Sequence, residues 1–206
     1  MHVTAKVTAR PSDQDGFGQV VLINGASSAG KTAVASALLS LLDQAWFLMS
    51  VDDINAMRHR RDIEGSELDD VLRRTRAGFH RAVAGMAAAG NNIVVDHVLS
   101  EPWRLDDCLD VFEGLDVVFV GVRCDAVELE RRERVRRDRP PGLALAQLSE
   151  VHVHSDYDVE IYTTNNSAAQ GAERIAAFLA RSGSGRAFDR LRSRRGAALV
   201  DPDGSS

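Results

Sequence analysis

The sequence predicts an α/β fold: a five-stranded parallel sheet of order 2-3-1-4-5, helices on both of its faces, and an arginine-rich lid. Three observations lead to this prediction. Short apolar runs alternate with longer segments of helical periodicity, which is typical of a parallel sheet covered on both faces. A glycine-rich loop joins the first run to the first helical segment. Of the 25 basic residues only Lys6 and Lys31 are lysines, and one dense run of arginines lies late in the chain.

The individual elements follow from their patterns. The strands are apolar runs without polar alternation, as strands buried on both faces require, and the helices repeat apolar residues three and four positions apart. Gly90 ends the longest helix, and Ser167 is expected to cap the last one. In chain order we expect a strand at 20–23, a helix at 33–42, a strand at 46–49, a helix at 66–89, a strand at 93–95, a helix at 102–112, strands at 117–122 and 159–162, and a helix at 167–179.

The length of 206 residues fits one domain with a small appendage. We expect a flexible N-terminal arm at 1–18 and a compact domain at 19–180, with its lid at about 126–142. Residues 181–206 carry six arginines against three aspartates, a net charge of +3, and predict a basic, disordered tail.

Composition excludes several classes of protein. The net charge of −5, from 25 basic and 30 acidic residues, provides no global basic field for nucleic acid. No apolar run approaches the ~20 residues that span a bilayer, and the start of the chain lacks a secretory signal. Two cysteines cannot form a disulfide framework. We therefore expect a cytoplasmic protein without a nucleic-acid or membrane partner.

The glycine-rich loop matches the phosphate-binding motif G-x-x-x-x-G-K-[ST] in full, between a predicted strand and a predicted helix. Its backbone N–H groups and the helix N-terminus attract an anion. Lys31 is expected to reach the β- and γ-phosphates of ATP, and the Thr32 hydroxyl to ligate Mg²⁺. The predicted ATP-binding residues of the loop are Gly25, Ala26, Ser27, Ser28, Ala29, Gly30, Lys31 and Thr32.

Two absences narrow the class of nucleotide-binding protein. No N-K-x-D guanine signature occurs, which argues against a GTPase, and the third strand does not end in Asp-Glu, which argues against an AAA-type ATPase. A small body with one arginine-rich segment after the fourth strand favours a P-loop kinase that acts on a small-molecule acceptor.

Carboxylates follow the second and third strands. Asp52 and Asp53 come directly after the second strand, where one of them can accept the proton of the acceptor hydroxyl, and we favour Asp52. The alternative is that an aspartate caps the next helix. Asp96 ends the third strand and is expected to hold Mg²⁺ or to orient the acceptor, unless it is a turn residue. His97 points the opposite way and is expected to be a packing histidine.

The arginine run predicts a lid over ATP. Arg132, Arg136 and Arg139 share one helical face, and guanidinium groups stabilise the charge on a transferring phosphoryl group. A solvated charged helix and a nucleic-acid patch are the alternatives. Trp103 is a candidate wall of the substrate pocket, with Arg58 beside the acceptor. His152 and His154 lack a third ligand, so a zinc site is not expected.

These residues resemble the chloramphenicol phosphotransferase-like family. The resemblance covers residues 20–179 and is carried by the loop motif, by Val51-Asp52, by Gly-Val-Arg-Cys-Asp at 121–125, by Arg136-Arg-Asp-Arg139 and by Tyr157-Asp-Val-Glu160. It implies an adenylate-kinase-like fold that phosphorylates a hydroxyl of an antibiotic with ATP. It also implies that Asp52 is the base and that Arg136 and Arg139 are lid arginines.

Departures from the family pattern lie on the acceptor side. The segment 57–67 is strongly charged, and Asp96-His97 stands where the family has paired aspartates. Arg58, Arg60, Arg61 and Arg73 favour a larger or more anionic acceptor. We therefore expect an ATP-dependent O-phosphotransferase like a chloramphenicol 3-O-phosphotransferase. The alternatives are a metabolic nucleoside, nucleotide or sugar-acid kinase, and a nucleotide-dependent regulatory or toxin-like module that uses the basic tail as its partner arm.

Overall fold

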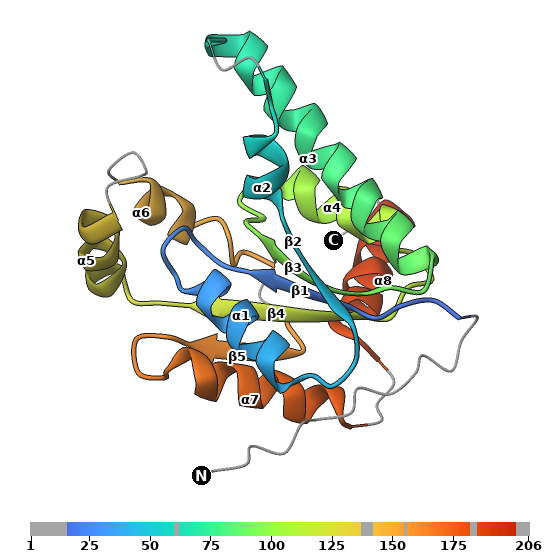
Figure 1. The fold of residues 1–206 in the computed structure, drawn as a ribbon. Helices are drawn as coiled ribbons and strands as arrows, with labels where there is room; N and C mark the ends of the chain where they lie inside the picture. The colour runs from blue at the N-terminus through green and yellow to red at the C-terminus, as the bar shows by residue number, and fades with distance from the viewer. Residues whose placement is uncertain (1–15, 60–61, 137–141, 155, 182–184, 201–206) are drawn as a thin grey trace, which may run out of the picture.

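The computed structural model describes residues 16–59, 62–136, 142–154, 156–181 and 185–200, so Arg60, Arg61 and Arg139 lie outside it. Five parallel strands form one sheet in the order β2-β3-β1-β4-β5, which confirms the predicted fold class (Figure 1). The strands are β1 (Val20–Asn24), β2 (Trp46–Ser50), β3 (Asn92–His97), β4 (Val117–Arg123) and β5 (Val159–Tyr162).

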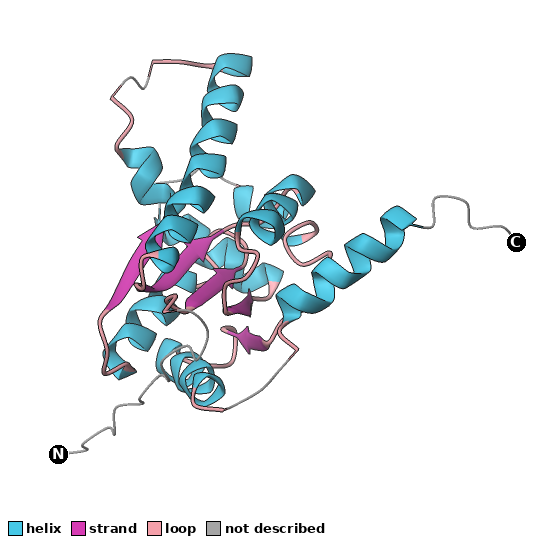
Figure 2. Cartoon of the chain, turned by 90° about the vertical axis from the view of Figure 1, so that its right-hand side faces the viewer, coloured by secondary structure: helices cyan, strands magenta, loops and turns pink. Residues whose placement is uncertain are grey.

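Helices cover both faces of the sheet (Figures 1 and 2). Successive side chains of a strand point to opposite faces, so Val21 and Ile23 of β1 pack into one half of the core and Val20 and Leu22 into the other. The first half is closed by α1 (Lys31–Leu41) and α7 (Ala168–Leu179). The second half is closed by α3 (Gly65–Ala88), α4 (Pro102–Val111) and α8 (Ala187–Val200).

The register of the sheet places the ends of three neighbouring strands side by side. Asp96 of β3 is paired with Ile23 of β1 on one side and with Ser50 of β2 on the other. Gly25 opens the phosphate loop just beyond Ile23, and α2 (Val51–Ala56) begins directly after Ser50. The residues that follow these strands therefore meet beyond the carboxyl edge of the sheet, where ligands of such folds bind.

The segment predicted as the lid, at about 126–142, contains α5 (Ala126–Arg136), and α6 (Leu143–Leu148) begins directly after it. Glu133 of α5 holds the two together, because its carboxylate accepts the N–H groups of Gly142 at 2.8 Å and of Ala144 at 3.0 Å. These N–H groups belong to the start of α6 and have no partner within that helix. A buried carboxylate thus caps α6 from the neighbouring helix.

The structure corrects the prediction for the C-terminal tail. Residues 187–200 form the helix α8, although 201–206 lie outside the described residues. Ala187, Phe188 and Leu191 are buried against the sheet and α4. Composition suggested disorder because arginines dominate the segment, but Ala187, Phe188 and Leu191 fall on one face that docks. Residues 1–15 of the expected arm also lie outside the described residues.

Aspartates of the body form ion pairs with arginines of α8 and of the turn before it. Arg186 donates to Asp116 at 2.8 Å, and Arg190 donates to Asp156 at 2.5 Å. Arg194 contacts the same Asp156 carboxylate. Among the described residues no helix is long and apolar enough to cross a membrane.

Replacing the buried anchor of α8 tests whether this helix is part of the fold. Phe188→Ala should lower the free energy of unfolding by about 3–5 kcal/mol, because the cavity it leaves lies inside the core. Urea denaturation followed by circular dichroism measures the change. Ser193→Ala, at an exposed position of the same helix, should stay within about 0.5 kcal/mol of wild type. Equal stability of the two variants would contradict the docking of α8.

Candidate active site

Two glycines of the phosphate loop are required by geometry. Gly30, the N-cap of α1, has a φ of 95°, in the left-handed region that side chains disfavour. A Cβ at Gly25 would lie 2.4 Å from the carbonyl oxygen of Val122 in the neighbouring strand. The chain can therefore curl tightly at the N-terminus of α1, where free N–H groups and the helix dipole attract an anion.

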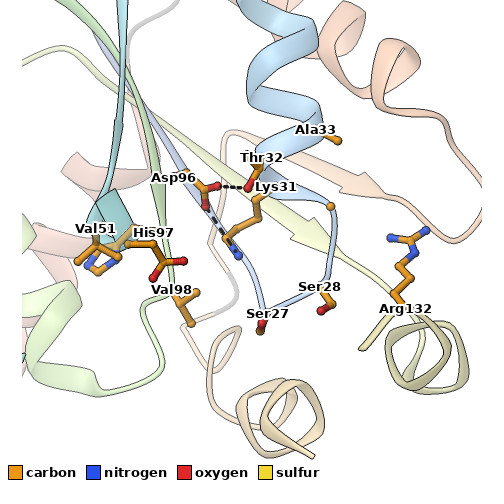
Figure 3. Close-up of a pocket in the computed structure, with 12 residues that line it drawn as sticks. Ser27, Ser28, Lys31, Thr32, Ala33, Val51, Asp96, His97, Val98 and Arg132 are labelled. Carbon is orange, nitrogen blue, oxygen red and sulfur yellow. Dashed lines mark hydrogen bonds and ion pairs between the residues drawn. The ribbon is translucent and has the colours of Figure 1, made fainter. Parts of the chain in front are cut away.

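Lys31, Thr32 and Asp96 lie together at this loop (Figure 3). The Lys31 ammonium donates to the carbonyl oxygen of Ala26 at 3.0 Å and lies 3.8 Å from Asp96 Oδ1. The Thr32 hydroxyl donates to Asp96 Oδ2 at 2.5 Å. The hydroxyl and the carboxylate predicted as magnesium ligands therefore face the same space, beside the buried side chain of Lys31.

A cavity of about 340 Å³ lies in front of this group. Asp52, in the first turn of α2, lines the cavity, whereas the neighbouring Asp53 does not. Ser50 is the N-cap of α2, since its hydroxyl accepts the Asp52 N–H at 3.2 Å, so neither aspartate has that role. The lining residues are Ser27, Ser28, Gly30, Lys31, Thr32, Ala33, Val51, Asp52, Asp96, His97, Val98 and Arg132.

Arg132 is the lid arginine that reaches the phosphate loop. Its guanidinium donates to Thr163 Oγ1 at 3.1 Å and to the Thr163 carbonyl oxygen at 2.9 Å, and it lies 3.4 Å from the Ala29 carbonyl oxygen. Arg136 is the last residue of α5, and the predicted Arg139 lies outside the described residues. One of the three predicted lid arginines is thus seen at the site.

Two predicted acceptor-side residues are engaged locally. Arg58 donates to Asn55 Oδ1 at 3.2 Å. The indole N–H of Trp103 donates to Glu101 at 2.6 Å, and the Arg73 guanidinium lies 4.5 Å from the centre of the Trp103 ring. Trp103 does not line the cavity described above.

A second opening of about 360 Å³ continues the site on the other side of Arg132. The two openings share Ser28, Gly30, Ala33 and Arg132. The second one extends to Thr163 and to the turn before α7. A nucleotide lying across the loop would place its phosphates in the first opening and its nucleoside in the second.

Sequence reasoning missed two amides that hold the loop. Gln147 of α6 accepts the N–H of Ser27 through its side-chain oxygen at 2.8 Å. Asn24, at the end of β1, accepts the Leu99 N–H at 2.9 Å and donates to the Val151 carbonyl oxygen at 2.8 Å. Asn24 directly precedes the loop motif, which was a usable signal, but Gln147 lies in an apolar helix and belongs to no local pattern.

His97 faces the opposite side of β3 from Asp96, as neighbouring strand residues do. Its Nε2 lies 2.9 Å from Nε2 of His80, and Nδ1 of His80 lies 2.6 Å from Asp107. Burial lowers the pKa of both imidazoles, that of His97 well below its usual range. Burial thus favours the neutral form of both rings, and this chain of contacts is a buried packing network.

A family model described as "Chloramphenicol phosphotransferase-like protein" matches residues 18–180. The chain belongs to this family. Two proteins of Mycobacterium tuberculosis, from strains CDC 1551 and H37Rv, are each named "Putative O-phosphotransferase". Each is 30% identical over 200 residues, which cover 86% of this chain and 89% of the relative. The family resemblance predicted from the motifs is confirmed, and the protein is a phosphotransferase.

Solved structures, two kinases among them, share the fold of this chain. The Mycobacterium tuberculosis APS kinase, solved with AMPPNP and APS, is 18% identical with a TM-score of 0.62 and covers 80% of this chain and 99% of its own. The Deinococcus radiodurans tunicamycin resistance protein is 19% identical with a TM-score of 0.60, covering 80% and 98%. A Sinorhizobium meliloti gluconokinase is 17% identical with a TM-score of 0.57, covering 88% and 99%. At these identities the likeness establishes the fold.

The contact between Gln147 and Ser27 predicts how α6 affects nucleotide affinity. Gln147→Glu should weaken ATP binding by about tenfold or more, because a carboxylate holds the Ser27 N–H more strongly and repels the γ-phosphate. Gln147→Met, which keeps the size but removes the acceptor, should bind ATP at least as tightly as wild type. Isothermal titration calorimetry measures both affinities. Equal affinities for the two variants would show that Gln147 does not contact the phosphate site.

Proposed function

We propose that this protein transfers the γ-phosphate of ATP to a hydroxyl group of a small molecule, with Mg²⁺ as cofactor and an antibiotic as the acceptor. One observation carries the proposal: the phosphate loop, the pair Thr32 and Asp96, and the carboxylate of Asp52 all border one cavity. This arrangement combines an anion site, oxygen ligands for a hard cation and a proton acceptor, which are the parts that phosphoryl transfer needs. Such chemistry fits the cytoplasm, where ATP is available.

Thr32 and Asp96 are the residues that would hold Mg²⁺. Their oxygens already share a hydrogen bond of 2.5 Å, and a hydroxyl and a carboxylate are hard ligands that suit this ion. When bound, the ion neutralises charge on the β- and γ-phosphates. Lys31 adds a positive charge on the same side, since its ammonium lies 3.8 Å from Asp96. Within the described residues no group of three or more His, Cys, Asp or Glu side chains could enclose a metal, so the ion would rely on phosphate and water for its other ligands.

Asp52 is proposed as the base that accepts the hydroxyl proton. It lies in the first turn of α2, where Ser50 holds its backbone N–H, and the residue lines the cavity. Arg132 closes the site from the lid, and Arg136 is proposed to add positive charge as the lid closes over ATP.

A panel of acceptors separates the antibiotic proposal from the metabolic alternative. Among proteins of the same fold are a tunicamycin resistance protein, an APS kinase and a gluconokinase. A panel of chloramphenicol, a nucleoside and a sugar acid, offered with ATP, distinguishes the two. Phosphorylation of the antibiotic alone supports the proposal, and phosphorylation of the sugar acid or nucleoside alone replaces it with the metabolic alternative.

The regulatory or toxin-like alternative relies on a free basic tail. Three described arginines of this region, Arg186, Arg190 and Arg194, instead contact Asp116 or Asp156 of the body. A partner arm would have to break these ion pairs first. This observation favours the enzyme.

Substituting the proposed base gives a direct test of its role. Asp52→Asn should lower the rate of transfer to an accepted substrate by about 10²–10⁴-fold, because the hydroxyl loses its proton acceptor. ATP affinity should stay at the wild-type value. Asp53→Asn, one residue further and outside the cavity, should keep the wild-type rate. Steady-state kinetics with coupled ADP detection measures both, and a fully active Asp52→Asn enzyme would exclude this residue as the base.

The lid arginine is tested by a pair of substitutions in α5. Arg136→Ala should lower kcat by about 10²-fold if this side chain stabilises the transferring phosphoryl group. Arg131 serves as the control, since it is 62% exposed and hydrogen-bonded to Glu128 of its own helix. Arg131→Ala should leave kcat unchanged. The same small loss in both variants would assign Arg136 to the protein surface.

A further inference from the structure

A separate cavity of about 390 Å³ lies between the turn from β3 to α4 and the segment that follows α6. Its walls are largely apolar and include Leu99, Leu105 and Val153. The His154 ring forms part of the wall, and burial lowers its pKa to about 4, so this ring is uncharged at pH 7. The volume and lining suit an aromatic or aliphatic group of a small molecule.

This cavity adjoins the proposed phosphoryl-transfer site. Val98 lines the phosphate cavity and the next residue, Leu99, lines this one, so the two cavities border consecutive residues of the chain. Asn24 lies at the junction, accepting the Leu99 N–H at 2.9 Å, with its amide nitrogen 3.5 Å from Nε2 of His154. A molecule seated here could therefore extend a hydroxyl toward the γ-phosphate, on the side of the loop away from the nucleoside opening.

The polar rim of the cavity is acidic. It contains three carboxylates, those of Glu101, Asp106 and Glu150. Glu101 is bound by Arg104, and Asp106 lies 3.8 Å from Arg195. Glu150 is exposed and interacts electrostatically with Arg104, but among the described residues it forms no direct ion pair. Charge complementarity at this mouth thus favours a cation and disfavours a carboxylate or phosphate.

We propose that this cavity binds the body of the acceptor and that the acceptor is an apolar alcohol carrying an amine, which pairs with Glu150. The proposal rests on the phosphotransfer proposed above and names the class of its substrate. This cationic acceptor differs from the anionic acceptor that Arg58 and Arg73 suggested in the sequence. In the structure both arginines contact neighbouring side chains, Arg58 that of Asn55 and Arg73 that of Trp103.

Three probes with a phenyl ring and a hydroxyl group, differing in charge, test the class. They are phenylalaninol, a cation; 3-phenyl-1,2-propanediol, which is neutral; and 3-phenyllactate, an anion. Their affinities for the full chain with AMPPNP and Mg²⁺ are measured by saturation-transfer NMR titration. Phenylalaninol should bind about threefold or more tightly than the diol, and phenyllactate most weakly, as expected for one exposed ion pair. Glu150→Gln should remove the difference between phenylalaninol and the diol.

Cavity variants locate the binding. Leu105→Trp fills the cavity, and Val153→Arg places a guanidinium at its mouth, so each should abolish phenylalaninol binding while AMPPNP affinity is unchanged. Val153 is 72% exposed, so its substitution should leave the fold intact. Val127→Arg, at a position 79% exposed on α5, is the matched control and should bind like wild type.

Each outcome bears on one proposal. The inference is overturned if phenylalaninol does not bind, if phenyllactate binds as tightly, or if Val153→Arg behaves like Val127→Arg. It is supported if the order of affinities and the cavity variants behave as expected. If the cavity binds phenylalaninol as expected but the γ-phosphate of ATP is transferred only to water, the proposed ligand class of the cavity is kept and the proposed transferase function fails.

Discussion

The contact of Asp96 with Lys31 and Thr32 is the interaction on which this site depends. Asp96 ends a central strand, whereas Lys31 and Thr32 begin the first helix, so the contact ties the sheet to the phosphate loop. The charges of Lys31 and Asp96 compensate each other in a place where either alone would be costly to bury. An incoming phosphate would pair with Lys31 and an incoming cation with Asp96, each more strongly than the two side chains pair with each other. The buried lysine therefore stays available for binding.

A chain of contacts supports the loop from the C-terminal side. Asp158 accepts the N–H of Ala187 at 2.8 Å and so caps the start of α8, while burial raises its pKa. Its neighbour Tyr157 accepts from Asn24 at 2.9 Å, directly before the loop. The segment that carries these residues also borders the apolar cavity through His154. The helix that composition assigned to a disordered tail is therefore part of the frame around the site.

Much of the fold and part of the site could be predicted from the sequence. Apolar runs mark strands buried on both faces, so the fold class and the strand order could be predicted. The loop motif is local and Asp96 directly ends an apolar run, so Lys31, Thr32 and Asp96 could be picked out as site candidates. Gln147 could not be found, because its contact with Ser27 spans 120 positions and no local pattern marks it. The docking of α8 was not predicted, because the composition of the segment is dominated by arginines. Only three buried apolar residues hold the helix against the body. The sequence could not show that Asp52 lines the cavity and Asp53 does not, because this depends on how α2 is placed against the phosphate loop.

Phosphorus-31 NMR of ATP turnover, with an accepted alcohol present, tests most directly whether the chain is an alcohol phosphotransferase. We expect the γ-phosphorus signal of ATP to disappear as a phosphate monoester signal grows in equal amount. That new signal should be coupled to protons on the carbon that bore the hydroxyl. Release of inorganic phosphate alone, at a rate independent of the alcohol, would contradict phosphoryl transfer to a hydroxyl and would make the protein a nucleotide hydrolase built on a kinase fold.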